Sequence, residues 1–80
     1  MEREKIKERV KKVIAKVLNT DISEISDNDN FIFDLGADSI QSVQLIAGFE
    51  EEFGIDMDED KAKEVQSVSG AVDFIAGYLE

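Results

Sequence analysis

The chain contains no cysteine, no histidine and no proline among its 80 residues. Without cysteine it can form neither a disulfide nor a thiolate metal site, which suits a reducing cytoplasm. Without histidine or cysteine, a serine nucleophile would lack its usual base, and the segment from Gly36 to Ser39 does not match the Gly-x-Ser-x-Gly elbow of serine hydrolases. These absences argue against nucleophilic catalysis by the chain's own side chains.

Long apolar runs and nucleic-acid motifs are also missing. No apolar run approaches the ~20 residues of a membrane-spanning helix, and the N-terminal segment is charged and amphipathic, without the apolar centre of a signal peptide. The sequence also lacks a glycine-rich phosphate loop and the basic and aromatic pattern of nucleic-acid-binding proteins. We therefore expect a cytoplasmic protein with no membrane insertion and no nucleic-acid partner.

Acidic side chains dominate the composition, but they are unevenly distributed. The net charge is −10; residues 1–20 carry seven basic and three acidic side chains, whereas residues 21–80 carry two basic and sixteen acidic ones. From Asp34 to Asp60 there are nine acids and no base. Such a field attracts proteins with basic docking patches by speeding their encounter. The alternative is that the charge only keeps the domain soluble.

The spacing of apolar residues predicts helices and no sheet. Helical periodicity covers about residues 3–18, 39–53 and 68–79, with a short helix ending near Glu64 and a helical turn at 22–25. No segment alternates strictly, so we expect an all-α bundle of three main helices plus one short helix, forming a single domain over residues 1–80. The connection after the first helix is expected to be anchored by Ile22, Ile25, Phe31, Ile32 and Leu35.

Ser39 is predicted to be the first residue of the second main helix. Gly36 relieves the backbone of the preceding loop, and Asp38 followed three residues later by Gln41 fits a capping box. The Ser39 hydroxyl would therefore be exposed where free N–H groups and the positive end of the helix dipole meet. A phosphate attached to it would lie in a favourable field.

The segment Leu35-Gly36-Ala37-Asp38-Ser39-Ile40 resembles the Asp-Ser-Leu phosphopantetheine attachment site of acyl carrier proteins, with Ile40 in place of the usual leucine. The likeness continues through residues 50–55 and 72–75 and covers roughly residues 3–78. It implies an acyl-carrier-protein-like fold and a 4′-phosphopantetheine arm covalently attached to Ser39 by a phosphopantetheinyl transferase, with Asp38 as the helix N-cap beside the arm. The alternative is that Ser39 only starts the helix.

The resemblance also implies a function. The protein would not be an enzyme; it would carry fatty-acyl or polyketide-type intermediates as thioesters, as a monomer, between acyl-transfer, synthase or ligase enzymes with basic docking patches. Two alternatives stay open: an aminoacyl or peptidyl carrier protein, and an unmodified helical protein-interaction domain.

The resemblance places two groups of residues around Ser39. In the family the first turns of the second helix form the recognition surface, which assigns partner docking to Ile40, Val43, Ala47 and Glu50. A bound acyl chain would lie between the helices, in a pocket lined by Ile46, Met57, Ala62, Val65 and Ala71. These five residues can equally be read as plain core.

Several positions depart from the family's usual residues. Fatty-acid-synthesis carriers commonly have acids at the positions of Gln41 and Gln44, so we expect a specialised carrier rather than the housekeeping one. Phe33 stands where a polar or acidic residue is usual, and is either buried or in contact with the arm or a partner. Asp58 replaces a frequent proline, which predicts a looser start of the short helix. Gly48 would make room for the neighbouring phenylalanine or for a bound acyl chain.

We expect no metal site. Asp56, Asp58 and Asp60 match the first ligands of an EF-hand calcium loop. The match then fails, because Lys61 stands at the sixth position, where glycine is needed, and Ser67 at the twelfth, where a bidentate glutamate is needed.

The acidic charge predicts that thermal stability increases with salt. Sodium or magnesium chloride screens the repulsion among the acids of residues 21–80, so we expect the melting temperature to rise with salt concentration. Melting curves followed by circular dichroism across a salt series measure this, and a flat melting temperature would contradict it.

Overall fold

A computed structural model of the chain describes residues 2–79. Its elements, in order, are α1 (Arg3–Leu18), the 3₁₀ turn η1 (Ile22–Glu24), α2 (Ser39–Phe53), α3 (Glu59–Glu64) and α4 (Val68–Leu79). Within this described part of the chain the only β-type pairing is an isolated antiparallel bridge between Asn30 and Ser67. The predicted all-α bundle of three main helices and one short helix is therefore confirmed.

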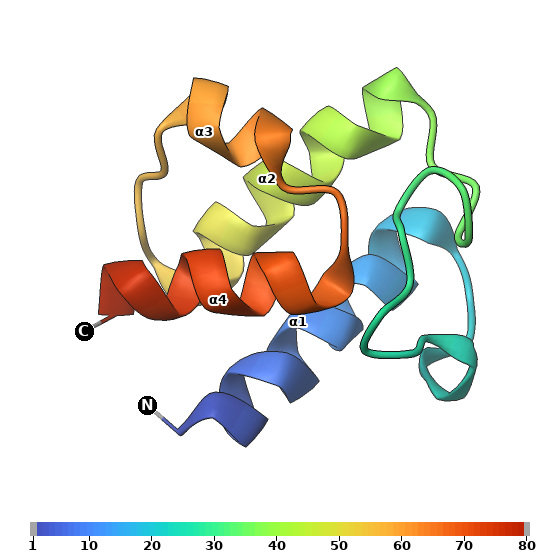
Figure 1. Cartoon of the computed structure of the whole chain (residues 1–80), viewed down its shortest axis with the longest axis horizontal. Helices are drawn as coiled ribbons and strands as arrows, with labels where there is room; N and C mark the ends of the chain where they lie inside the picture. Colours follow the sequence, from blue (N-terminus) through green and yellow to red (C-terminus); the bar gives the residue numbers. More distant parts are fainter. Residues whose placement is uncertain (1, 80) are drawn as a thin grey trace.

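The three long helices share one core. α1 packs against both α2 and α4, while α3 packs against α2. Figure 1 shows α3 and the N-terminal half of α1 on opposite sides of the molecule, with α4 between them. The most completely buried large side chains are Ile6, Val10, Ile14, Leu45, Val68, Val72 and Ile75. Because α1 contacts both other long helices, its apolar face forms the centre of this core.

The helices begin and end where local sequence signals predict. α2 ends at Gly54, which adopts the left-handed conformation of a helix C-cap with a φ of 63°. α4 begins after Ser67, whose hydroxyl accepts a hydrogen bond from the Gly70 amide at 3.1 Å. The looser start of α3 stays a prediction, and the structure adds that this start is capped. The Asp58 carboxylate accepts a hydrogen bond from the Lys61 amide at 3.2 Å, so a capping aspartate replaces proline.

The long loop between α1 and α2 has fewer apolar anchors than predicted. Ile25 and Phe31 are buried and Leu35 is half-buried. Ile22 and Ile32 are 43% and 49% exposed, so their predicted anchoring role is wrong. Each lies in a tight turn in which another side chain, Ile25 or Phe31, already occupies the inward position.

Backbone hydrogen bonds join this loop to the start of α4. The Phe31 amide donates to the Gln66 carbonyl at 2.9 Å, and the Val68 amide donates to the Asp29 carbonyl at 3.0 Å. The Phe31 carbonyl in turn accepts from the Ala37 amide at 2.8 Å. These bonds fix the segment that leads into α2 relative to α4.

Ion pairs join the same loop, and the end of α2, to α1. The ammonium groups of Lys11 and Lys7 lie 2.7 Å and 3.0 Å from the Asp27 carboxylate oxygens. They hold the pKa of Asp27 below its ordinary value. Arg9 Nε lies 2.7 Å from the Glu52 carboxylate. The basic face of α1 therefore neutralises part of the acidic charge carried by the rest of the chain.

Gly48 allows α1 and α2 to approach closely. A Cβ atom built on Gly48 would lie 2.7 Å from Cγ1 of Val13, closer than real Cβ contacts come. The prediction that Gly48 makes room for the neighbouring phenylalanine or an acyl chain is therefore wrong. The space is filled by a β-branched side chain of α1, which has little rotamer freedom with which to move away.

We expect Gly48→Ala to destabilise the protein although alanine is the better helix former. Overpacking costs about 1–3 kcal/mol, which exceeds the roughly 1 kcal/mol gained in helix propensity. Gly77→Ala is the matched control, because it also lies in a helix but a Cβ there meets nothing within 4 Å. Urea unfolding should show a lower free energy of unfolding for Gly48→Ala and a higher one for Gly77→Ala. Equal stabilisation by both changes would refute the close-approach argument.

Candidate functional site

Ser39 is the first residue of α2, as predicted, and the capping box that precedes it is complete. The Asp38 carboxylate accepts a hydrogen bond from the Gln41 amide at 2.7 Å, and the Gln41 side-chain oxygen accepts one from the Asp38 amide at 3.1 Å. This reciprocal pair fixes the direction in which the backbone enters α2. The position of Ser39 is therefore set by its immediate neighbours.

The turn before Ser39 is held by an asparagine that the sequence analysis did not single out. The Asn30 side-chain oxygen accepts hydrogen bonds from the amides of Ile32 at 2.9 Å and Phe33 at 3.0 Å. Gly36 then adopts a φ of 74°, which a glycine takes without strain. Asparagine side chains often accept a hydrogen bond from the backbone amide two residues later in a turn. Asn30 could therefore have been identified from its place in this loop.

The Ser39 hydroxyl is free to react. Ser39 is exposed, and its side chain makes no hydrogen bond with any residue of the described chain. The Ser42 hydroxyl one turn later is occupied, because it donates to the Asp38 carbonyl at 3.0 Å. The first amides of a helix have no intrahelical acceptor, so Ser39 Oγ stands beside free N–H donors and the positive end of the α2 dipole.

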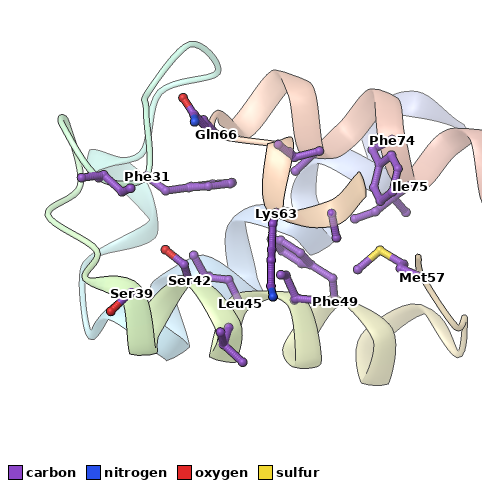
Figure 2. A pocket seen from close by; sticks show the side chains of 16 residues that line it. Phe31, Ser39, Ser42, Leu45, Phe49, Met57, Lys63, Gln66, Phe74 and Ile75 are labelled. Atoms are coloured by element: carbon purple, nitrogen blue, oxygen red, sulfur yellow. The ribbon is translucent and has the colours of Figure 1, made fainter. Parts of the chain in front are cut away.

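Ser39 borders a partly open cavity of about 410 Å³ lined by residues of α2, α3, α4 and the loops before α2, α3 and α4. In Figure 2, Ser39 lies at one end of the row of lining side chains and Met57 lies at the other end. The lining is mainly apolar: Phe31, Ile32, Val43, Leu45, Ile46, Phe49, Met57, Ala62, Val65, Ala71, Phe74 and Ile75. Four polar side chains complete it: Ser39, Ser42, Lys63 and Gln66.

The structure brings together all five predicted pocket residues. Ile46, Met57, Ala62, Val65 and Ala71 line this one cavity, although they come from three helices and two loops. The aromatic members of the lining, and its polar members Ser42, Lys63 and Gln66, were not predicted from the sequence. Ser42 could have been found, because a residue three positions after Ser39 shares its helix face. Nothing in the spacing distinguishes the orientation of Lys63 from that of Lys61.

The predicted docking residues do not form one uniform surface. Ile40 is 69% exposed and Val43 is exposed beside the cavity. Ala47 is exposed but faces a groove between α1 and α2. Glu50 is half-buried, and its carboxylate accepts a hydrogen bond from the Met57 amide at 2.9 Å, so it has a structural partner that the sequence did not indicate.

Phe33 is the most exposed large apolar side chain in the described part of the protein, at 85%. The alternative that Phe33 is buried is therefore excluded. Its backbone is held in the turn by Asn30, so the ring projects into solvent from a fixed position six residues before Ser39. A phenylalanine held in water at this position offers apolar area to a contacting molecule.

Residues 2–79 offer neither a metal-binding cluster nor a membrane-spanning helix. Among these residues no group of three or more histidine, cysteine, aspartate or glutamate side chains is placed to hold a metal ion. No helix in the same range is both long and apolar enough to cross a membrane.

The family described as the phosphopantetheine attachment site matches residues 8–75 of the chain. The match spans α2, the cavity-lining segments and Ser39 itself. Domains of this family are carriers that bear covalently attached 4′-phosphopantetheine. Since the matched residues make up most of the sequence, the chain belongs to the phosphopantetheine attachment-site family and is a carrier of the acyl-carrier-protein type.

Proposed function

We propose that Ser39 is the residue that bears the 4′-phosphopantetheine arm, and that residues 1–80 act as one acyl-carrier domain. The observation that carries this proposal is the position of Ser39: it is exposed, has an unbonded hydroxyl at the start of α2, and borders the apolar cavity. A phosphopantetheinyl transferase would join Ser39 Oγ to the phosphorus of the arm and break the pyrophosphate bond of coenzyme A. The hydroxyl proton is lost, and adenosine 3′,5′-bisphosphate leaves.

The residues around Ser39 suit a phosphate ester. The free amides at the start of α2 and the helix dipole favour negative charge at Ser39 Oγ. The Asp38 carboxylate is also negative, but its hydrogen bond to the Gln41 amide directs it into the cap. When bound, the arm would supply a terminal thiol that holds cargo as a thioester. The domain itself supplies position, shielding and docking.

The cavity supports an acyl cargo in preference to an aminoacyl one. Twelve of its sixteen lining residues are apolar, and Leu45, Phe49 and Ile75 among them are almost completely buried. Each methylene moved from water into such a cavity contributes about 0.8 kcal/mol. A charged amino group would gain nothing there, so we propose fatty-acyl or polyketide-type intermediates as the cargo.

We propose that partner enzymes dock on the apolar surface formed by Phe33, Ile40 and Val43. All three side chains are exposed, and they flank Ser39 in sequence on both sides. Asp34 and Asp38 lie between them in an acidic stretch without a base, which favours partners whose apolar contact area is rimmed by lysine or arginine.

Intact mass spectrometry tests the attachment site. After incubation of the purified protein with coenzyme A, magnesium and a broad-specificity phosphopantetheinyl transferase, we expect the mass to increase by one arm. Ser39→Ala should abolish the gain. Ser42→Ala is the matched control, because it removes the other hydroxyl at the cavity and should leave the gain intact.

The opposite pattern would support the alternative function. If a folded sample gained no mass with an active transferase, the exposed Phe33, Ile40 and Val43 would favour an unmodified protein-interaction domain. If Ser39→Ala still gained the mass of one arm, the arm would be attached to another residue.

We also propose a specialised carrier, on the basis of two uncharged residues of α2. The side-chain oxygen of Gln41 accepts the capping-box hydrogen bond from the Asp38 backbone amide. The Gln44 side chain is exposed and available to partners. Neither supplies the negative charge that is common in fatty-acid-synthesis carriers.

Purified type II fatty-acid elongation enzymes should therefore use the loaded protein less efficiently than their own carrier. Each missing surface ion pair is worth ~0.2–1 kcal/mol, so two reduce kcat/KM about two- to thirtyfold. Gln44→Glu should recover part of this loss. Asn28→Glu, which adds the same charge in the distant loop, should recover none. If the elongation enzymes used the loaded wild-type protein and their own carrier with equal kcat/KM, the proposal of a specialised carrier would be disproved.

A further inference from the structure

Lys63 places a positive charge in the wall of a mainly apolar cavity. It is the only charged side chain among the described residues that line this cavity. Lys61 and Lys63 are also the only bases in residues 21–80, against sixteen acids. Figure 2 shows the Lys63 side chain extending from α3 toward the part of α2 that carries Leu45 and Phe49. The base therefore lies at the exposed edge of the space proposed for cargo, within the acidic part of the chain, residues 21–80.

The Lys63 ammonium group is available to a ligand. Its one ion pair in the described residues is with Glu59, four residues earlier on α3, at 3.6 Å, and both side chains are exposed. An exposed pair of this kind is weak and readily exchanged. Ser42 and Gln66 also line this cavity, but the Ser42 hydroxyl already donates to the Asp38 carbonyl. Lys63 is therefore the lining side chain that offers an anionic group of the cargo a charged donor in the cavity wall.

The phosphate of the arm does not explain the position of Lys63. That phosphate would be bonded to Ser39 Oγ, at the first residue of α2. Lys63 extends toward Leu45, which lies six residues further along the helix, or about 9 Å at 1.5 Å per residue. An anion that reaches Lys63 must therefore be carried further along the cavity than the phosphate.

We propose that Lys63 adapts this carrier to acyl groups that bear a free carboxylate. The inference rests on the proposed attachment of the arm to Ser39 and adds the chemical class of the cargo. The sixteen acidic side chains of residues 21–80 repel a carboxylate. Lys63 offsets that repulsion locally with a charge-assisted hydrogen bond. The apolar walls hold the methylenes between the thioester and the carboxylate.

Two cargoes of equal length test the proposal. The transferase loads Ser39 from octanoyl coenzyme A or from its ω-carboxy counterpart, and thioester hydrolysis and the melting temperature are measured on each product at low salt. We expect the ω-carboxy thioester to hydrolyse two- to fivefold more slowly on the wild type than on Lys63→Gln. Lys63→Arg should retain the protection, and high salt should reduce it.

Two controls separate the effect of a charge in the cavity wall from a general effect of charge on α3. Lys61→Gln removes the same charge from the same helix at a residue that does not line the cavity, and should behave as wild type. The octanoyl thioester should respond little to Lys63→Gln. Equal responses of the two cargoes, or of Lys61→Gln and Lys63→Gln, would overturn the proposal.

A further comparison distinguishes contact of Lys63 with the cargo carboxylate from contact with the phosphate of the arm. If Lys63→Gln shifts the melting temperature of the arm-bearing protein without cargo as much as that of the ω-carboxy form, and more than that of the protein without the arm, Lys63 contacts the arm rather than the cargo and the proposal fails. If no cargo is loaded on Ser39, the proposed function fails and this inference fails with it.

Discussion

Hydrophobic burial along the inner face of α2 is the interaction on which the rest of the structure depends. Leu45 and Phe49 are almost fully buried in the core, yet both also line the cavity. The Phe49 ring lies 6.5 Å from the Phe31 ring, which joins the loop before Ser39 to the same cluster. On its other side α2 packs closely on α1 through Gly48. α2 therefore packs on α1 and α3, lines the cavity and presents Ser39, so changes to its inner face affect both the stability of the fold and the shape of the cavity.

The sequence predicted the features that short-range interactions decide. The capping box of Asp38 and Gln41 and the C-cap at Gly54 act within a few residues, so helix bounds could be read from the chain. Contacts between distant residues could not. Gly48 is explained by Val13, thirty-five positions earlier, and no local pattern links the two. Ile32 carries an apolar side chain in an apolar segment, but Phe31 takes the inward position.

The candidate site likewise contains residues that the sequence predicted and residues that it did not. The serine and the five apolar pocket residues could be proposed because a resemblance supplied their places in the chain, and the structure gathers those five around one cavity. Side-chain direction on the short helix α3 could not be read. Ala62 turns inward, and of the two lysines beside it Lys63 rather than Lys61 lines the cavity. Glu50 was predicted to face partners, but it bonds the Met57 amide because the chain returns past it after Gly54.

The small size of α3 has a mechanical consequence. This helix has six residues and buries only Ala62, whereas α1, α2 and α4 each bury two or more side chains. The start of α4 is tied to the loop before α2 by backbone hydrogen bonds. α3 is therefore the cavity wall held by the least burial, and a bulkier occupant of the cavity would displace α3 outward while the backbone around Ser39 keeps its shape. The outer face of α3 would then report whether the cavity is filled.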